Sequence, residues 1–451
     1  MTGQWQAEDE AATGAAAHET GAATDQQQAA SAADAADAAD AADAAQKQGW
    51  RLEVLDSLDA LTASEWNALA GDDYPFLQHA YLSALESCGA ASAASGWHPA
   101  HLVVRDADGR LLAGLLRYLK LHSRGEYVFD QQWAEALEQA GGRYYPKQLT
   151  AVPFTPSDGP RLVTSPQLTS PAARRALLEW LWPHLKAGIA PAAEPGSALR
   201  RYEHSGFHLL FVSAQERQDW QAAIPELISR PGMQYHWQSR GEPDFATWLE
   251  SLRSKRRKEI RRERRKVAEQ GFTLARLEGA QIGPDDIEAF YRCYCMTYLE
   301  RGQRPYLPLD FFQQLRRSMP ERLLLVQARD EQGAPVAAAL CLIGSDCLYG
   351  RWWGSEVHAD CLHFEVCYYQ GLEFCLQRGL KRFDPGTQGE HKISRGFAAY
   401  TTGSLHWLMH PGLQEAVAEA VEEEARWLNK ARQQVTAMLP YREPAAQTAQ
   451  E

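Results

Sequence analysis

Acidic, imidazole, amine and guanidinium side chains are concentrated in one short segment, QGEHKISRGF at 388–397. The segment follows an apolar run and the turn Pro385-Gly386, and α/β folds place their sites in loops just beyond strand ends. Acyl transfer to an amine needs a base that removes the amine's proton and a cation that stabilises the tetrahedral oxyanion. The candidates for these two roles are Glu390, His391, Lys392 and Arg395. The alternative is a surface loop with incidental charge.

The chemical types of these candidates and their order along the loop suggest different roles. Glu390 or His391 would supply the base, whereas Lys392 or Arg395 would supply the cation. In an extended loop alternate residues project to one side, so Glu390 and Lys392 would share a face while His391 points away. We therefore expect Glu390 and Lys392 to act on the same substrate.

Polar and aromatic side chains also surround the run LYGRWWG at 348–354 and the helix-like segment that follows it. A strand alternates its faces, so one of the two Trp side chains is expected in the core. The amides at the start of the next helix would favour an acyl or phosphate oxygen. The expected substrate contacts in this half are Arg351, Trp353, His363, Glu365, Tyr368 and Gln388. For His363 and Tyr368, ordinary packing is the alternative.

The first half of the sequence offers a second group of aromatic and charged residues. Tyr and Trp have an apolar body and a polar tip, which suits a substrate-binding wall, and a Lys could meet a carboxylate or phosphate. The residues expected to form this wall are Asp130, Trp133, Tyr144, Tyr145 and Lys147. Core and hairpin packing is the alternative explanation of the aromatic residues.

A strongly basic stretch lies between these two groups. Residues 253–266 hold ten Lys or Arg and two Glu, in a helix-compatible segment that ends at Gly271. Ten cations repel one another and two Glu cannot offset them, which favours a polyanionic partner: nucleic acid, a CoA-type or carrier-protein phosphate, or anionic lipid. The residues expected to bind it are Arg257, Arg261, Arg264 and Arg265. A solvated helix face is the alternative.

These candidates must be positioned by an internally repeated set of elements. Two apolar runs joined by a turn predict a β-hairpin at 101–119, and the same pattern recurs at 323–343, with RDADG at 105 and RDEQG at 329, an offset of 224 residues. A helix-like segment precedes each hairpin and an aromatic strand follows it. These are Phe76–Ser87 and Glu126–Asp130 in the first half, and Phe311–Ser318 and Cys347–Trp353 in the second. Three matching elements in order indicate duplication.

The later elements complete an α/β pattern. Leu362, Val366, Tyr369, Leu372 and Leu376 recur at helical spacing, and Gly379 is expected to cap this helix. A strand should follow at LKRFD, and the last long helix should end near residue 438. Hairpin, strand, helix and strand in this order predict an α/β (α+β) layer fold with mixed sheets flanked by helices.

Length and composition fit two domains of ordinary size, since the chain has 451 residues. The net charge of −12 is misleading, because residues 1–46 hold nine carboxylates and no Lys or Arg. Residues 1–47 and 442–451 are predicted to be disordered, the former as an acidic Ala/Asp-rich tail. The eight Cys form no CxxC pair, so free thiols rather than a metal site are expected. Without an apolar span or signal peptide, a cytoplasmic location is expected.

Several stretches give the sequence a resemblance to the FemAB-like group of the GNAT acyltransferase superfamily. They are GEYVFDQQWAEALEQAGGRYYPKQLTAVPFTP, SLRSKRRKEIRRERRKVAEQGF, LYGRWWG, LHFEVCYYQGLEF and QGEHKISRGF. The resemblance covers roughly residues 50–438. It implies tandem GNAT-like domains, here 48–238 and 239–441, related to peptidoglycan-bridge transferases that use aminoacyl-tRNA. The relatives carry a Lys near an equivalent Gly-Phe element, which Lys392 matches with a different spacing.

The sequence departs from this group in two ways that leave the donor open. No [RQ]xxGx[GA] stretch precedes the helix at 361, so the usual amide loop for a pyrophosphate is missing. The long antiparallel helical arm of some relatives is also absent. The donor is therefore expected to be acyl-CoA, acyl-carrier protein or aminoacyl-tRNA, with no tightly bound cofactor.

The resulting hypothesis is an N-acyltransferase with its pocket between the two halves. Direct attack without a covalent enzyme intermediate is expected, because no Cys or Ser lies in a GxSxG-like elbow. The alternative is a non-catalytic protein that uses the basic helix to hold RNA or an anionic envelope component.

Overall fold

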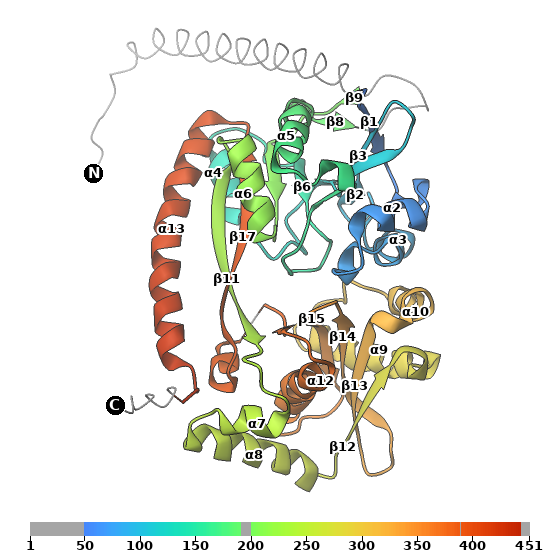
Figure 1. Ribbon diagram of the computed structural model, residues 1–451, viewed down its shortest axis with the longest axis vertical. Helices are drawn as coiled ribbons and strands as arrows, with labels where there is room; N and C mark the ends of the chain where they lie inside the picture. The colour runs from blue at the N-terminus through green and yellow to red at the C-terminus, as the bar shows by residue number, and fades with distance from the viewer. Residues whose placement is uncertain (1–48, 191–199, 388, 443–451) are drawn as a thin grey trace, which may run out of the picture.

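The computed structural model describes residues 49–190, 200–387 and 389–442 (Figure 1). The expected tail at 1–47, Gln388 and residues 443–451 lie outside these ranges. The described part is a mixed α/β structure in which eleven strands form one sheet and four strands form a second. The expected α/β class with mixed sheets is confirmed.

The first half of the chain begins with a strand and two helices. The sequence indicates this start, because Thr62 and Glu65 form a reciprocal capping box at the first helix. The elements of this half are β1 (Arg51–Leu55), α2 (Ala63–Ala70), α3 (His79–Ser87), β2 (Trp97–Pro99), β3 (His101–Arg105), β4 (Leu111–Leu115), β5 (Tyr118–Lys120), α4 (Gln131–Gln139), β6 (Lys147–Thr150), β7 (Leu162–Thr164), α5 (Pro171–Lys186), β8 (Ile189–Ala190), β9 (Arg200–Arg201), β10 (Gly206–Leu209), α6 (Ala214–Ala223) and β11 (Ile228–Gln238).

The second half begins after the short helix α7 and the basic helix α8. Gly379 adopts the left-handed conformation at the end of α12, as expected from its position. The elements are α7 (Phe245–Glu250), α8 (Ser254–Glu269), β12 (Thr273–Glu278), α9 (Pro284–Leu299), α10 (Leu309–Ser318), β13 (Leu323–Arg329), β14 (Pro335–Ile343), β15 (Cys347–Ser355), α11 (Leu362–Phe364), the π-helical turn η6 (Glu365–Tyr369), α12 (Gln370–Arg378), β16 (Arg382–Asp384), the 3₁₀ helix η7 (Glu390–Arg395), β17 (Ala398–Leu408) and α13 (Pro411–Met438).

The two halves share an outline of elements, to which the first half adds further strands and a helix. In each, a strand and two helices precede antiparallel strands, and a later strand pairs parallel to its neighbour. In the first half these strands are divided between two sheets, α4 precedes β6, and β7 pairs with β4. The parallel pairs are β6 with β10 and β15 with β16. This order is that of a tandem GNAT-like chain.

The hairpin repeat is preserved down to its turns. Both hairpins shift register at the Arg that ends the first strand, Arg105 in one and Arg329 in the other. In both turns an Asp carboxylate accepts the backbone N–H four residues later at 2.8 Å, and a Gly has φ of 83°. The local turn chemistry therefore survived where most other residues diverged.

The expected aromatic strand at Glu126–Asp130 is wrong. These residues form an irregular loop, and β6 takes the matching place in the sheet. Tyr127 has φ of 60°, which no strand residue adopts, and Glu126 and Asp130 both turn inward to Lys147. Buried ion pairing thus overrides the strand-like composition of the segment.

The halves are joined by an exchange of strands. The order across the large sheet is β16-β11-β17-β10, so β11 lies between β16 and β17, while β17 pairs with β10 of the first half. Helix α13 packs along β11 and β17 (Figure 1). The expected domain boundary at 238/239 falls at the end of β11.

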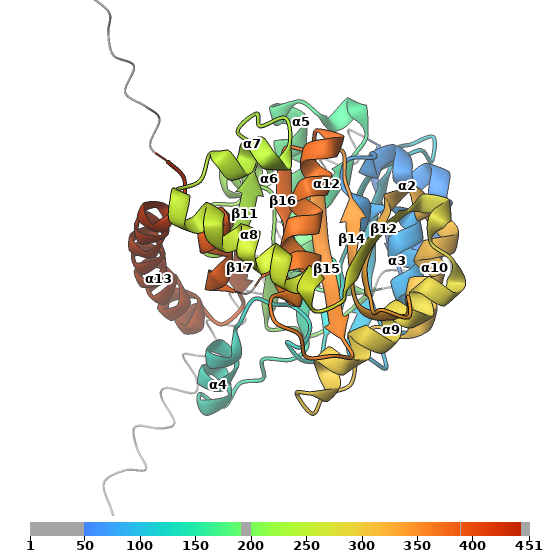
Figure 2. The same cartoon turned by 90° about the horizontal axis from the view of Figure 1, so that it is seen from below.

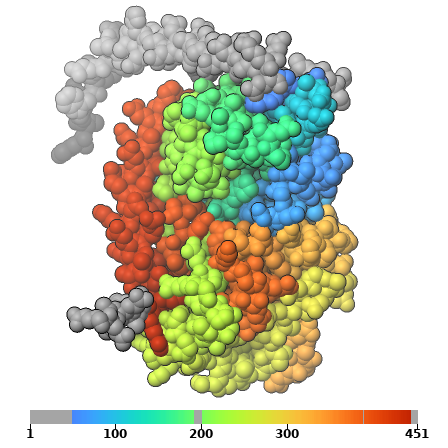
Figure 3. Space-filling model, viewed as in Figure 1, coloured from blue at the N-terminus to red at the C-terminus, as the bar shows by residue number. Residues whose placement is uncertain are grey.

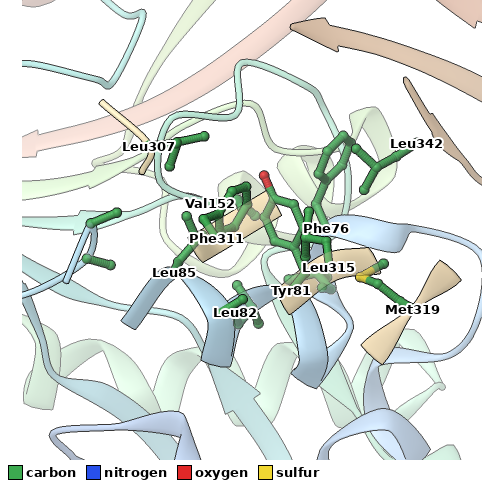
Figure 4. Packing of buried hydrophobic residues seen from close by; sticks show 14 of the residues in the cluster. Phe76, Tyr81, Leu82, Leu85, Val152, Leu307, Phe311, Leu315, Met319 and Leu342 are labelled. Atoms are coloured by element: carbon green, nitrogen blue, oxygen red, sulfur yellow. The ribbon is translucent and has the colours of Figure 1, made fainter. Parts of the chain in front are cut away.

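The hydrophobic core is also continuous across the halves. Helices α3 and α10 lie side by side (Figure 2). Between them Tyr81 meets Phe311 at 5.6 Å between ring centroids, and Phe76, Leu82 and Leu315 pack around this contact (Figure 4). Shared strands and a shared core thus join the two halves along the surface where they meet, which we call the seam.

Two glycines of β15 provide a test of how closely this strand packs against α9. A Cβ on Gly354 would overlap the backbone carbonyl of Cys293 on α9, whereas a Cβ on Gly350 would meet Phe383 at an ordinary 3.4 Å. We expect Gly354→Ala to lower the free energy of unfolding by about 3 kcal/mol and Gly350→Ala by less than about 1 kcal/mol, measured by urea denaturation. Equal stability of the two variants would contradict the close α9–β15 packing.

Candidate functional site

A buried ion pair marks the point where β15 and β16 separate. Their parallel pairing ends at Tyr349 and Asp384, while β15 continues to Ser355. The Asp384 carboxylate pairs with Arg351 and accepts hydrogen bonds from the Ser157 hydroxyl at 3.0 Å and the Gly386 amide at 2.9 Å. Burial raises the pKa of Asp384, but Arg351 and these donors lower it to about 2. Asp384 is therefore a fixed carboxylate.

His236 on β11 lies against this carboxylate. Its Nε2 is 3.5 Å from Asp384 and 3.0 Å from the Gln234 side-chain oxygen, and its ring stacks on Tyr400 at 4.0 Å. Burial lowers the pKa of His236 to about 4, so the ring is neutral at pH 7. Ser157 from the first half and His236 on the exchanged strand thus meet Asp384 from the second half at one point.

Lys392 is buried within the expected catalytic segment. Its ammonium donates to the Gly386 carbonyl at 2.6 Å, and burial lowers the pKa of Lys392 to about 8. Glu390 and His391, by contrast, are exposed. The expected extended loop is wrong, because residues 390–395 form the 3₁₀ helix η7, entered at Gly389 with φ of 107°. With three residues per turn, Glu390 and Lys392 do not share a face.

Arg395 and His391 hold η7 in place. The Arg395 guanidinium pairs with Glu263 of α8 at 2.7 Å, donates to the Tyr369 hydroxyl at 2.9 Å and lies 3.5 Å over the Phe364 ring. The His391 Nε2 is 2.8 Å from the Tyr368 hydroxyl. Arg395 therefore fastens the loop to the basic helix, and Tyr368 orients His391.

The other residues of the second half that were expected to contact the substrate do not lie together: some line a hollow, and Glu365 faces helix α8. His363 touches Trp353 and Tyr368 edge-on, both at 5.2 Å, and lines a hollow of 350 Å³ with Trp353. Burial lowers the pKa of His363 to about 4. Glu365 turns away from this hollow and accepts Arg264 of α8 at 3.0 Å.

The expected wall residues of the first half come together inside that half. The Lys147 ammonium binds Asp130, the Glu126 carboxylate at 2.7 Å and the Ser123 hydroxyl at 2.8 Å. The Tyr144 hydroxyl donates to Asp130 at 2.8 Å. Burial raises the pKa of Glu126 to about 7 and lowers that of neighbouring Lys120 to about 7.

Beside this cluster, Tyr145 and Trp133 differ in their exposure to solvent. The Tyr145 hydroxyl is 2.9 Å from Ser123 and the residue is half-exposed, whereas Trp133 is buried against His406 at 4.9 Å between ring centroids. The group is thus a buried polar network rather than an open aromatic surface.

A cleft of 250 Å³ between the halves is lined by residues that the sequence analysis did not select. They are Tyr127, Val128, Phe129 and Phe211 of the first half, Arg230–Gln234 on β11, Thr387, Thr402–Ser404 on β17, and Glu424 on α13. Phe129 is 70% exposed. Thr387 adjoins Gly386, whose carbonyl holds Lys392.

Backbone strain is concentrated along the same seam. Tyr127 and Phe211, both in the cleft, have φ of 60° and 51°, and Phe154 has φ of 56°. Phe154 lines a second seam cavity of 500 Å³ and stacks on Tyr306 at 5.2 Å. Aromatic residues rarely adopt positive φ, and such strain is typical of functional sites. No residue pattern in the sequence reveals it.

A FemAB-like family model, described as peptidoglycan biosynthesis/recognition, matches residues 57–443. The chain belongs to this FemAB-like family. The resemblance of its motifs to FemAB-like proteins is confirmed, and membership makes the chain a transferase. A search of curated proteins finds no match.

Solved structures similar to this FemAB-like chain include three of low identity. The C-terminal domain of a putative lysylphosphatidylglycerol synthetase from Agrobacterium fabrum has a TM-score of 0.47 at 9% identity, over 80% of this chain and 96% of that chain. FemX has a TM-score of 0.47 at 12% identity, over 79% and 98%. A tandem GNAT protein from the clavulanic acid pathway has 0.41 at 12%, over 80% and 99%. The fold assignment rests on the strand pairings described above.

The basic helix of the FemAB-like chain is largely neutralised by the fold. Six of its cations pair with carboxylates: Arg256, Arg257, Arg261, Arg264, Arg265 and Lys266. The partners include Glu250, Glu365 and Asp360, which the local count of two Glu did not include. All four arginines expected to bind a polyanion are among the paired ones. No helix of the described residues is long and apolar enough to cross a membrane.

The remaining cations of α8 form the free part of its surface. Arg253, Lys255, Lys258 and Arg262 are exposed and make no ion pair with the described residues. Lys255, Lys258 and Arg262 recur at three- and four-residue spacing, so they share one face of the helix. Helix α8 itself lies at the bottom of the molecule in the view of Figure 3.

Substitutions can distinguish the contribution of this unpaired face to polyanion binding from that of the paired arginines. We expect Lys255→Gln, Lys258→Gln and Arg262→Gln together to weaken binding to tRNA and to lower the slope of log K against log salt by about 2 to 3. Filter binding at several salt concentrations measures both. The control replaces Arg110, Arg143 and Arg175, exposed cations of the first half, with Gln. An equal loss in the control would contradict a local site.

The buried amine also predicts a stability change with a definite sign. A Lys ordinarily titrates near 10.4, so a folded pKa of about 8 means that the protonated amine destabilises the fold below pH 8 and costs progressively less up to about 10.4. We expect Lys392→Met to raise the free energy of unfolding at pH 7 by about 1 to 3 kcal/mol, and this gain to vanish near pH 11. Urea denaturation at both pH values measures it, with exposed Lys381→Met as the control. A loss of stability at pH 7 would contradict the prediction.

Proposed function

We propose that this FemAB-like chain transfers an acyl or aminoacyl group from an activated donor to an amine in the cleft between its halves. One observation carries the proposal: the buried Lys392 amine is held on the carbonyl of Gly386, directly beside the cleft residue Thr387. A buried, unpaired amine is costly, and groups with strongly perturbed pKa values are concentrated at functional sites.

In the proposed reaction the amine nitrogen attacks the donor carbonyl carbon. The new C–N bond forms as the C–S or C–O bond to the donor breaks, and the leaving group departs with a proton. One N–H group of the Lys392 ammonium donates to the Gly386 carbonyl. The other two N–H groups can donate to the oxyanion as it develops. Asp384 and Arg351 fix the start of the loop, because the Asp384 carboxylate pairs with Arg351 and accepts a hydrogen bond from the Gly386 amide at 2.9 Å.

Direct attack fits the chemistry of the cysteines. All eight are free thiols, and burial raises the pKa of both Cys341 and Cys347 to about 12. A thiolate is the nucleophilic form of Cys, so these two side chains are poor candidates for a covalent intermediate.

The surroundings of the loop support a donor that carries phosphates. Glu263 of α8 binds Arg395 of η7, so the helix with the free cationic face is attached to the reaction loop itself. A donor that carries phosphates would bind this face and reach the cleft. Acyl-CoA, acyl-carrier protein and aminoacyl-tRNA all satisfy this requirement. The family description, peptidoglycan biosynthesis/recognition, supports an acceptor from envelope metabolism.

A non-catalytic polyanion-binding protein is the second candidate, favoured by the same unpaired cations on α8. The two candidates differ at Lys392, because a binding protein needs the helix and not the buried amine. Both would lose affinity on neutralisation of Lys255, Lys258 and Arg262.

The decisive experiment is turnover of Lys392 variants. We expect Lys392→Ala to lower kcat by about 10² to 10³, the cost of one oxyanion contact, without loss of fold by circular dichroism. Because the cation is required, the wild-type rate should fall as the pH rises above about 8. Product formation is followed by mass spectrometry with each donor class against a panel of amines, with exposed Lys381→Ala as the control. Wild-type turnover in folded Lys392→Ala would remove this assignment.

A further inference from the structure

A continuous chain of hydrogen-bonding groups leads from the cleft into the first half. Ser404, which lines the cleft, has its hydroxyl 2.8 Å from His406 Nε2. His406 Nδ1 is 2.8 Å from His208 Nδ1, and His208 Nε2 is 3.5 Å from the Tyr144 hydroxyl. The Tyr144 hydroxyl donates to the Asp130 carboxylate at 2.8 Å. These groups come from β17, β10 and the segment before β6, so only the folded chain brings them together.

The carboxylate at the inner end fixes the direction of every bond. Asp130 can only accept, because Lys147 holds its pKa below the usual range despite burial. Tyr144 must therefore donate to Asp130 and accept from His208, which places the His208 proton on Nε2. Its bare Nδ1 must accept from His406, so the His406 proton is on Nδ1.

The same logic reaches the cleft. With its proton on Nδ1, His406 has a bare Nε2 at 2.8 Å from the Ser404 hydroxyl, which is nearer than the Arg230 carbonyl at 3.4 Å, so Nε2 accepts the Ser404 proton. The Ser404 oxygen then presents its lone pairs to the cleft. Trp133 covers the two rings, at 4.9 Å from His406, and both histidines are about 1% exposed. All four bonds point from the cleft toward Asp130, in a region sealed from water.

The inner end continues to the surface. Asp130 shares Lys147 with Glu126 and with the Ser123 hydroxyl, and Ser123 is 2.9 Å from the hydroxyl of half-exposed Tyr145. A proton that arrives at Asp130 therefore has acceptors and donors leading outward. Buried polar chains of this kind are costly to fold, and packing alone does not require this one to end in the cleft.

We propose that Ser404, His406, His208, Tyr144 and Asp130 form a polarised proton relay that deprotonates the acceptor ammonium in the cleft. This inference rests on the proposed function, since it assigns the base of the same reaction. The substrate R–NH₃⁺ gives a proton to Ser404 as the Ser404 proton moves to His406. One proton is passed on at each group, and Asp130 becomes neutral. The freed amine then attacks the donor. The relay proton on Asp130 passes to Lys147 as Lys147 gives a proton to Ser123, and Ser123 passes one on to Tyr145.

The polarity is tested without any substrate. In protein labelled with ¹⁵N-histidine, NMR reports which ring nitrogen carries the proton. We expect His208 protonated on Nε2 and His406 on Nδ1, assigned with His208→Gln and His406→Gln. Tyr144→Phe should abolish the His406 preference for Nδ1. Tyr118→Phe, a buried tyrosine of the same half whose hydroxyl has no partner among the described residues, should leave it unchanged. A His406 proton on Nε2 in the wild-type protein would overturn the relay.

Turnover then separates the relay from the transfer reaction. We expect Ser404→Ala and Tyr144→Phe to lower kcat about 10- to 100-fold with little change in KM and to alter the solvent deuterium isotope effect on kcat. Ser404→Thr, which keeps the hydroxyl, should restore most of the rate. Full activity of Tyr144→Phe beside an inactive Lys392→Ala would overturn the relay and leave the proposed function standing. Full activity of Lys392→Ala beside an impaired Tyr144→Phe would remove Lys392 from the proposed function and leave the relay as the base of the observed transfer.

Discussion

The exchange of β11 and β17 is the constraint on which the rest of the structure depends. Each half ends its own set of strands at an edge that is completed by the other half, in the order β16-β11-β17-β10. An exposed strand edge is a template for pairing with other chains, and neither half could lose its partner without exposing one more. The same crossing brings Ser157, His236 and Asp384 together and sets Gly232 and Gly403 into the floor of the cleft. The site is therefore a product of the pairing and not of either half.

The distribution of buried charge distinguishes the two halves. Both contain a parallel strand pair, yet the second half holds the Asp384–Arg351 pair and Lys392 beside its pair, while the first holds the Lys147–Asp130–Glu126 cluster. Burying such groups costs several kcal/mol per ion unless each is paired and hydrogen-bonded. The strand framework is similar in the two halves, whereas the buried polar groups differ: an ion pair and a buried amine in one half, and a hydrogen-bonded network in the other.

Local signals in the sequence predicted much of the fold. The turns at Gly109 and Gly333 repeat because short-range turn chemistry determines them, and the helix ending at Gly379 follows from its periodicity. The exchange of strands was not predictable, since no local pattern says which strand lies beside β16. The strand predicted at 126–130 was wrong for the same reason, because the residue with which this segment pairs, Lys147, is distant in sequence.

The sequence predicted which types of residue form the candidate site but not how they are arranged. Lys392 and Asp130 are chemically conspicuous, and both are buried in polar surroundings. The 3₁₀ turn of η7 and the strained Tyr127 and Phe211 depend on tertiary packing, which residue spacing does not encode. Ser404, His208 and His406 lie in ordinary strand sequences and become a set only when β17 pairs with β10.

The arrangement of β11 and β17 is that of a swapped dimer folded into one chain. A single ancestral half that exchanged its last strand with a second copy would produce the same sheet, with the cleft at the symmetry axis. In a single chain each half can differ from the other, and the two walls of the cleft are indeed lined by different residues. A two-substrate reaction requires this asymmetry, because two identical walls cannot bind a donor and an acceptor differently.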